Sequence, residues 1–252
     1  MNDIIFNDDK DIDGFFGHLK SVGTEIEGTV YKKRNYAYKR YNLLYRDLYS
    51  NDIYIYRLLR YRDVIIENIY FIRGLMYCNG NVIGSISKYS GGVKCNKLQL
   101  HRYRLDKLIK ALSTLKKNIY ELSKLGICIE DNFLGNILYL DGSFRFIDTG
   151  SYYYYTDIPG VIDYDVNFVY RRNMTKILNK LFLSITDYKG IEDNFVYRFL
   201  LDNNSIYKDY MIDTELMINP DDTIIGIKKE LEEYIGYEID NFSQCRKILV
   251  KR

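Results

Sequence analysis

Three oxygen-bearing side chains lie at short spacing in the middle of this 252-residue chain. Asp131 precedes Asn136 by five residues, and Asp148 follows two short apolar runs and stands two residues before Gly150. Carboxylate and amide oxygens are ligands that suit Mg²⁺, and a carboxylate can also take the proton of an attacking hydroxyl. The residue types and their spacing therefore indicate phosphoryl-transfer chemistry.

The spacing is weak evidence when taken alone, because Asp63 and Asn68 repeat it without an apolar segment ending in Asp-x-Gly close behind. Between the two candidate metal ligands, Asp141 and Gly142 form a strong turn signal flanked by apolar runs, which predicts a hairpin over 137–147. A hairpin with acidic ends is the structural alternative to a metal site.

Short strands around one helix are predicted upstream of these residues. The predicted helix spans Asp52–Tyr61, with Ser50 and Asn51 as candidate N-terminal caps. A loop is predicted over Gly23–Gly28. The predicted strands, rich in β-branched and aromatic residues, are Phe16–Val22, Thr29–Lys33, Tyr36–Tyr41, Asn68–Met76 and Val82–Ile86.

Helices dominate the prediction for the rest of the chain, where apolar residues recur at helical spacing. The predicted helices are Leu105–Leu125, Asp165–Ile185 and Thr223–Tyr237, and Ser90-Gly91-Gly92 is the candidate connection before them. A strand-rich part, residues 1–89, followed by a helix-rich part, residues 90–252, predicts an α+β fold of two lobes with a crevice between them.

Composition excludes several classes of function. The net charge of +2 and pI near 8.1 do not favour a nucleic-acid partner. No apolar run approaches the roughly 20 residues of a membrane span, and the acidic amino terminus does not resemble a signal peptide. A cytoplasmic protein is therefore expected, or an effector that is delivered without a recognisable signal peptide. Four scattered cysteines and two histidines disfavour a zinc site, a disulfide framework and a Ser-His-Asp triad.

The segment VGTEIEGTVYKKRNYAYKRY is similar to the glycine-rich loop and the two following strands of the protein-kinase-like superfamily, which includes small bacterial members and small-molecule kinases. Gly23 and Gly28 match the first and third glycines of that loop, while Glu25 stands at the second. Lys39 matches the strand lysine that binds the α- and β-phosphates of ATP. Asp52 best matches the helix carboxylate with which this lysine pairs in the family.

The central segment extends the resemblance. It implies that Asp131 is the catalytic base, and that Asn136 and Asp148 bind Mg²⁺. The chain departs from the family pattern at Ile129, where a histidine is usual, and at Phe133, where protein kinases often carry lysine. The resemblance covers most of the chain and implies a bilobal protein-kinase-like fold, with a strand-rich N-lobe containing one main helix and a helix-rich C-lobe.

Several of these residues also have a purely structural explanation. Residues 23–28 could form an ordinary hairpin turn, Lys39 could be a surface lysine, and Asp52 could serve as a helix cap. Asp165 matches the aspartate that braces the catalytic loop in the family, or simply caps a helix. Tyr152–Tyr155 are candidate phosphorylation sites, although packing against the lobe is the favoured interpretation.

The expected function is an ATP- and Mg²⁺-dependent phosphotransferase, a divergent protein kinase that transfers the γ-phosphate of ATP to a Ser, Thr or Tyr hydroxyl. The alternatives are a pseudokinase that binds a nucleotide or partner without turnover, and a small-molecule kinase. A binding module built on tyrosines and on Arg57, Arg60 and Arg62 is a third class. A protein substrate is expected, and neither nucleic acid nor a membrane span.

Overall fold

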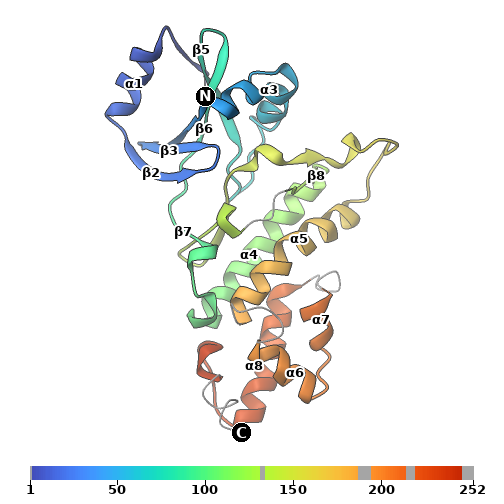
Figure 1. The fold of residues 1–252 in the computed structure, drawn as a ribbon. Coiled ribbons are helices and arrows are strands. Elements are labelled where there is room, and N and C mark those ends of the chain that lie inside the picture. Colours follow the sequence, from blue (N-terminus) through green and yellow to red (C-terminus); the bar gives the residue numbers. More distant parts are fainter. Residues whose placement is uncertain (1, 131–133, 187–193, 214–218, 246–252) are drawn as a thin grey trace. The chain divides into compact units, whose positions relative to one another are not determined.

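A computed structural model of the chain separates into two compact units (Figure 1). One consists of Met1–Gly91 with Phe146–Ser151, and the other of Gly92–Arg145 with Tyr152–Arg252. The segment Phe146–Ser151 thus packs with the first unit, although the residues on both sides of it belong to the second. The residues that the structure describes are 2–130, 134–186, 194–213 and 219–245.

The first unit contains a mixed six-stranded sheet with the order β1-β5-β6-β4-β3-β2. β1 pairs with β5 in parallel, and the other neighbours are antiparallel. The hairpins β3–β4 and β5–β6 confirm the two predicted strand pairs; the second turns at Asn79 and Gly80, whose φ angles are 49° and 81°. The strands are β1 (Ile4–Phe6), β2 (Lys20–Glu25), β3 (Gly28–Lys33), β4 (Tyr36–Tyr41), β5 (Ile72–Cys78) and β6 (Asn81–Lys88).

The predicted strand Phe16–Val22 is wrong in its first part, which belongs to helix α1 (Asp9–Gly17). The side chain of Asp8 caps this helix by accepting a hydrogen bond from a first-turn N–H group. Ile12 and Phe16, four residues apart, are both buried. Capping and a helical spacing of apolar residues therefore decide the structure of this segment, and β2 begins after it at Lys20.

Helices pack on both faces of the six-stranded sheet. Adjacent residues of a strand point to opposite faces, and Leu75 and Met76 of β5 belong to different core clusters. Met76 packs in the cluster that contains the buried residues of α1. Leu75 packs in the cluster to which α3 contributes Leu58 and partly buried tyrosines of α2 also belong. These two helices are α2 (Leu43–Tyr49) and α3 (Asp52–Leu59), and α3 confirms the helix predicted there.

The second unit is mainly helical. Its 20-residue amphipathic helix, α4, matches the predicted Leu105–Leu125, and of the apolar face expected from the spacing, Leu108, Leu112, Leu115, Ile119 and Leu122 are fully buried. α4 contacts both α5 and α8. The helices are α4 (Leu105–Lys124), α5 (Val166–Thr186), α6 (Phe195–Asp202), α7 (Lys208–Ile212) and α8 (Pro220–Ile235).

A hairpin forms where the sequence predicted one. Its strands are β9 (Ile137–Leu140) and β10 (Ser143–Phe146), and Asp141 and Gly142 turn it with φ angles of 50° and 75°. Both residues take the left-handed conformation that a two-residue hairpin turn requires. β7 (Val93–Lys94) pairs with β9, and β8 (Ile127–Cys128) pairs with β11 (Tyr153–Tyr154).

Short 3₁₀ helices occur between these elements: η1 (Cys95–Lys97), η2 (Leu100–Arg102), η3 (Leu134–Asn136), η4 (Thr149–Ser151) and η5 (Tyr155–Asp157). Among the described helices, none has the length and apolar character needed to cross a membrane. The described chain is therefore an α+β structure with a mixed six-stranded sheet. A bilobal kinase-like arrangement, and its division after residue 89, stay predictions.

Candidate functional site

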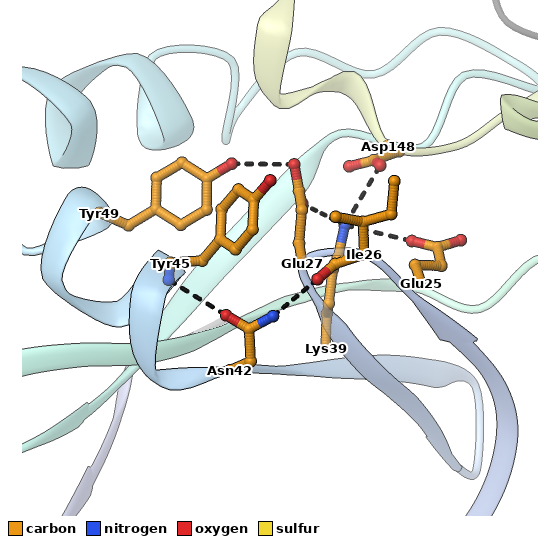
Figure 2. Close-up of polar contacts among 8 residues, drawn as sticks. All are labelled: Glu25, Ile26, Glu27, Lys39, Asn42, Tyr45, Tyr49 and Asp148. Carbon is orange, nitrogen blue, oxygen red and sulfur yellow. Dashed lines mark hydrogen bonds and ion pairs between the residues drawn. The ribbon is translucent and has the colours of Figure 1, made fainter.

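Lys39 is a buried cation on β4, an interior strand of the sheet. Its side chain is only 11% exposed, and its ammonium group lies among three carboxylates (Figure 2). The Nζ atom is 2.5 Å from Glu27 Oε2, 3.2 Å from Asp148 Oδ2 and 3.2 Å from Glu25 Oε2. The alternative of a surface lysine is therefore wrong.

Asp148 reaches this lysine because backbone hydrogen bonds attach its segment to the first unit. The N–H of Phe146 donates to the carbonyl of Asn68 at 2.7 Å, and the N–H of Tyr70 donates back to the carbonyl of Phe146 at 2.9 Å. Asn68 has a φ of 61°, which interrupts the predicted strand Asn68–Met76 and delays β5 to Ile72. Asp148 itself has a φ of 56°, a conformation that aspartate tolerates better than most residues.

The pKa values of Lys39 and Asp148 are both raised in this cluster, for different reasons. Burial alone lowers the pKa of Lys39, but the charges of Asp148 and Glu27 outweigh it and leave that pKa above its usual value. Burial raises the pKa of Asp148; Lys39 opposes this shift, while Glu27 and Glu25 add to it. With all four groups ionised, the cluster carries an excess of negative charge around one ammonium group.

The predicted loop Gly23–Gly28 is wrong, because most of it lies in β2 and β3. Glu25 is paired with Gly28, so only Ile26 and Glu27 form the turn between the two strands. A Cβ at Gly28 would lie 2.0 Å from the carbonyl oxygen of Arg40, so glycine is required there by the close approach of β3 and β4. A Cβ at Gly23 would meet nothing within 4 Å. The binding roles expected for Gly23 and Gly28 stay predictions.

Strand register places both glycines on the face of the sheet that carries Lys39. Gly23, Val30 and Lys39 are aligned across β2, β3 and β4. Glu25, Gly28 and Tyr41 form the adjacent row, as shown by the same pairings. Directly paired residues project to the same face, and Gly28 adds no side chain between Glu25 and the lysine.

The expected pair between Lys39 and Asp52 is not formed within the described part of the chain. Asp52 is the exposed first residue of α3, and the cap of that helix is Asn51, whose side chain accepts from the N–H of Ile53 at 2.9 Å. Glu27 stands beside the lysine where the helix carboxylate was expected. Sequence reasoning missed Glu27, because the resemblance directed attention to a helix.

The hairpin turn is fastened to the start of α2 (Figure 2). The N–H of Asn42 donates to the carbonyl of Glu27 at 2.8 Å, and its side-chain amide donates to the carbonyl of Ile26 at 2.6 Å. The Asn42 side-chain oxygen caps α2 by accepting from the N–H of Tyr45 at 3.2 Å. The hydroxyl of Tyr49 donates to Glu27 Oε1 at 3.1 Å. The position of Glu27 is thus set by its backbone and by its side chain.

In the second unit, a buried asparagine braces the strand that leads toward the predicted catalytic loop. Asn173 is fully buried on α5, and its side-chain oxygen accepts from the N–H of Ile129 at 2.8 Å. Its amide group donates to the carbonyl of Ile127 at 2.9 Å and to Ser123 Oγ at 3.1 Å. Asp165, which the resemblance offered for a bracing role, is exposed and caps α5 by accepting from the N–H of Asn167 at 2.8 Å.

The tyrosines after Asp148 pack within the second unit, as the favoured interpretation held. Tyr152 is 3% exposed, and Tyr153 and Tyr154 form β11 against β8. The hydroxyl of Tyr153 accepts a hydrogen bond from Arg172 Nη2 at 2.6 Å. Their packing gives no support for an exposed row of phosphate acceptors.

The remaining predicted site residues are distributed over the chain. Asp131 and Phe133 lie outside the described residues. Asn136 ends η3 in the second unit, and Asp148 belongs to the first. No group of three or more His, Cys, Asp or Glu side chains in the described ranges is arranged to hold a metal ion. The three carboxylates around Lys39 converge on its ammonium group instead.

The comparisons with known proteins add no family. A scan against protein-family models finds no match to this chain, and a search of curated proteins finds none either. The residues and their geometry therefore carry the functional argument.

Proposed function

We propose that this chain is an ATP- and Mg²⁺-dependent phosphotransferase, a divergent protein kinase that acts on Ser, Thr or Tyr hydroxyls. One observation carries the proposal. Lys39 and Asp148, which the resemblance selected separately for phosphate and metal binding, lie 109 residues apart in sequence, and the lysine donates a hydrogen bond to the carboxylate at 3.2 Å.

The three carboxylates and the ammonium group of Lys39 fit a metal-bound nucleotide better than a free phosphate. A free anion would be repelled by the three carboxylates, whereas magnesium-bound ATP brings a cation for Asp148 and phosphate oxygens for Lys39. When bound, magnesium-bound ATP supplies the transferable phosphoryl group and the charge that neutralises it. Lys39 would then hold phosphate oxygens, and Asp148 would hold the metal.

Asp131 would orient the acceptor hydroxyl and take its proton. Catalysis of this type depends mainly on positioning and on charge stabilisation, because the transferred group passes through a loose transition state. The placement of Lys39 beside Asp148 supports such a mechanism.

A pseudokinase is the second candidate, and a specific observation favours it. An ammonium group has three N–H donors, and three carboxylates surround that of Lys39. A phosphate would have to displace one of them or share a donor. A nucleotide- or partner-binding protein without turnover would tolerate this competition better than an enzyme would.

Phosphate transfer from labelled ATP distinguishes these candidates. The purified chain is incubated with Mg²⁺ and γ-labelled ATP, with and without a general protein acceptor, alongside Asp131→Asn and Asp148→Asn. The control is Asp202→Asn, a change of the same charge at the exposed end of α6. We expect incorporation in the parent and the control, and none in the other two variants.

A parent chain that transfers no label but is stabilised by magnesium-bound ATP would support the pseudokinase. A ligand at about 100 times its dissociation constant adds roughly 2.7 kcal/mol to the free energy of unfolding. Neither transfer nor stabilisation would refute both candidates. Transfer that survives in both aspartate variants would refute the assigned roles.

A further inference from the structure

The two carboxylates of the β2–β3 hairpin contact the same lysine in different ways. Glu27 lies in the turn and has a hydrogen-bonded contact with Lys39 at 2.5 Å. Glu25 ends β2 and contacts the ammonium at 3.2 Å as an ion pair. We propose that Glu27 is the positioning residue that holds the ammonium of Lys39 beside Asp148, in place of a carboxylate from a helix. Its consequence for catalysis rests on the proposed function.

Both oxygens of the Glu27 carboxylate have partners, which fixes its orientation. Oε2 accepts from Lys39, and Oε1 accepts from the hydroxyl of Tyr49 at 3.1 Å (Figure 2). Tyr49 is held in turn by its ring contact with Tyr41, whose ring centroid is 4.7 Å away. Rotation of the carboxylate away from Lys39 would therefore cost two hydrogen bonds.

The backbone of the turn is also fixed, which is unusual for the tip of a hairpin. Asn42 binds the carbonyl groups of both turn residues, Ile26 and Glu27, through its side chain and its N–H group. The same side chain caps α2, so the turn, the start of α2 and Tyr49 form one connected unit. Glu27 is thus carried by a rigid support, as a positioning residue requires.

The position of Lys39 matters because its ammonium must meet phosphate oxygens whose location is set by other residues. Misplacing a reacting or charge-stabilising group by about 1 Å can cost about 10²-fold in rate. The ammonium group of Lys39 stands at the end of a long, flexible side chain. Its position, 3.2 Å from Asp148 Oδ2, therefore depends on the groups that bind it. Glu27 makes the shortest of these contacts.

The test compares Glu27→Gln with Glu25→Gln, which removes the same charge from the same hairpin and the same lysine. Tyr49→Phe removes one anchor of Glu27, and Glu67→Gln is a control at an exposed carboxylate of the first unit. Two properties are measured in each protein: the ¹⁵N relaxation of the Lys39 ammonium group without nucleotide, and kcat and KM for magnesium-bound ATP.

We expect Glu27→Gln to release the ammonium group, so that its order parameter falls below about 0.6, and to lower kcat about 10²-fold with a smaller change in KM. Tyr49→Phe should give an intermediate loss of order. Glu25→Gln should leave the ammonium ordered, and Glu67→Gln should match the parent in every measurement. A purely structural role for Glu27 would lower thermal stability without this split between kcat and KM.

An ammonium that stays ordered in Glu27→Gln would overturn the proposal, and so would equal losses of order in Glu27→Gln and Glu25→Gln. Unchanged kcat in Glu27→Gln would overturn it as well. A parent chain without phosphate transfer would instead refute the proposed kinase activity, and the relaxation measurements would still decide whether Glu27 positions Lys39.

Discussion

Replacing Lys39 with methionine should destabilise the first unit, because three carboxylates would lose their shared counterion. At an effective dielectric constant of about 20, a contact of 3.2 Å corresponds to roughly 5 kcal/mol of gross attraction. The dehydration of the ammonium offsets most of this attraction. Removing one partner of a buried ion pair typically costs about 3–5 kcal/mol.

The exposure of the partners reduces that figure. The side chains of Glu27 and Asp148 are 29% and 31% exposed, so water can partly solvate them once the lysine is gone. We therefore expect Lys39→Met to lower the free energy of unfolding by about 2–4 kcal/mol at pH 7. Urea unfolding measures this change as a lower midpoint with an unchanged slope.

Lys88→Met is the matched control, since Lys88 is an exposed residue at the end of β6 in the same sheet. A surface substitution of this kind should change the free energy of unfolding by less than about 0.5 kcal/mol. A deficit in Lys39→Met that is no larger than the one in this control would refute the argument that the lysine compensates the cluster.

The pH dependence supplies a second check. Burial and the neighbouring glutamates already raise the pKa of Asp148, and Lys39 opposes that rise. Without the lysine the folded-state pKa rises further above the unfolded value of about 3.9. A raised pKa gives a contribution that is present below the unfolded pKa and lost as the pH rises through the folded pKa. The deficit of Lys39→Met should therefore shrink between pH 7 and about pH 4; an equal deficit at both would contradict this reasoning.

Two further predictions concern buried backbone. Asn173→Ala should lower the free energy of unfolding by about 2–4 kcal/mol in urea titrations, because the N–H of Ile129 and a nearby carbonyl lose their partner inside the protein; a loss below about 0.5 kcal/mol would show that another group replaces it. Gly28→Ala should cost at least about 1–3 kcal/mol through overpacking against β4. Gly23→Ala, where a Cβ meets nothing, should change stability by less than about 0.5 kcal/mol, and similar effects of the two alanines would contradict the strand register.

The elements that the sequence predicted well are those whose ends are fixed by local chemistry. Asn79-Gly80 and Asp141-Gly142 accept the left-handed backbone of a hairpin turn, so both hairpins follow from a few adjacent residues. The cap of α3 and the apolar face of α4 are local signals of the same kind. The resemblance selected Lys39 for phosphate binding and Asp148 for metal binding separately, and the structure shows that the two are in contact.

Asn173 could not have been selected in this way. A buried asparagine within a helix has no sequence signal, because its partners Ser123, Ile127 and Ile129 lie 44–50 residues away and depend on how the helices pack. The backbone conformation of Asn68 could not be predicted from the sequence either. Its left-handed conformation follows from hydrogen bonds to a segment near residue 146, which no local pattern near residue 68 indicates.

Glu27 was hidden by an error in the element before it. The prediction ended the first strand at Val22 and treated the next six residues as a loop, in which neither carboxylate has a defined direction. The observed strand continues to Glu25 and pairs that residue with Gly28, so the turn has only two residues. With this register, Glu25 projects to the face that carries Lys39, and Glu27 follows at once in a turn held by Asn42. A carboxylate from the hairpin thus reaches the lysine through a strand register that is fixed locally. A contact from Asp52 would instead have required α3 to pack closer to the sheet than it does.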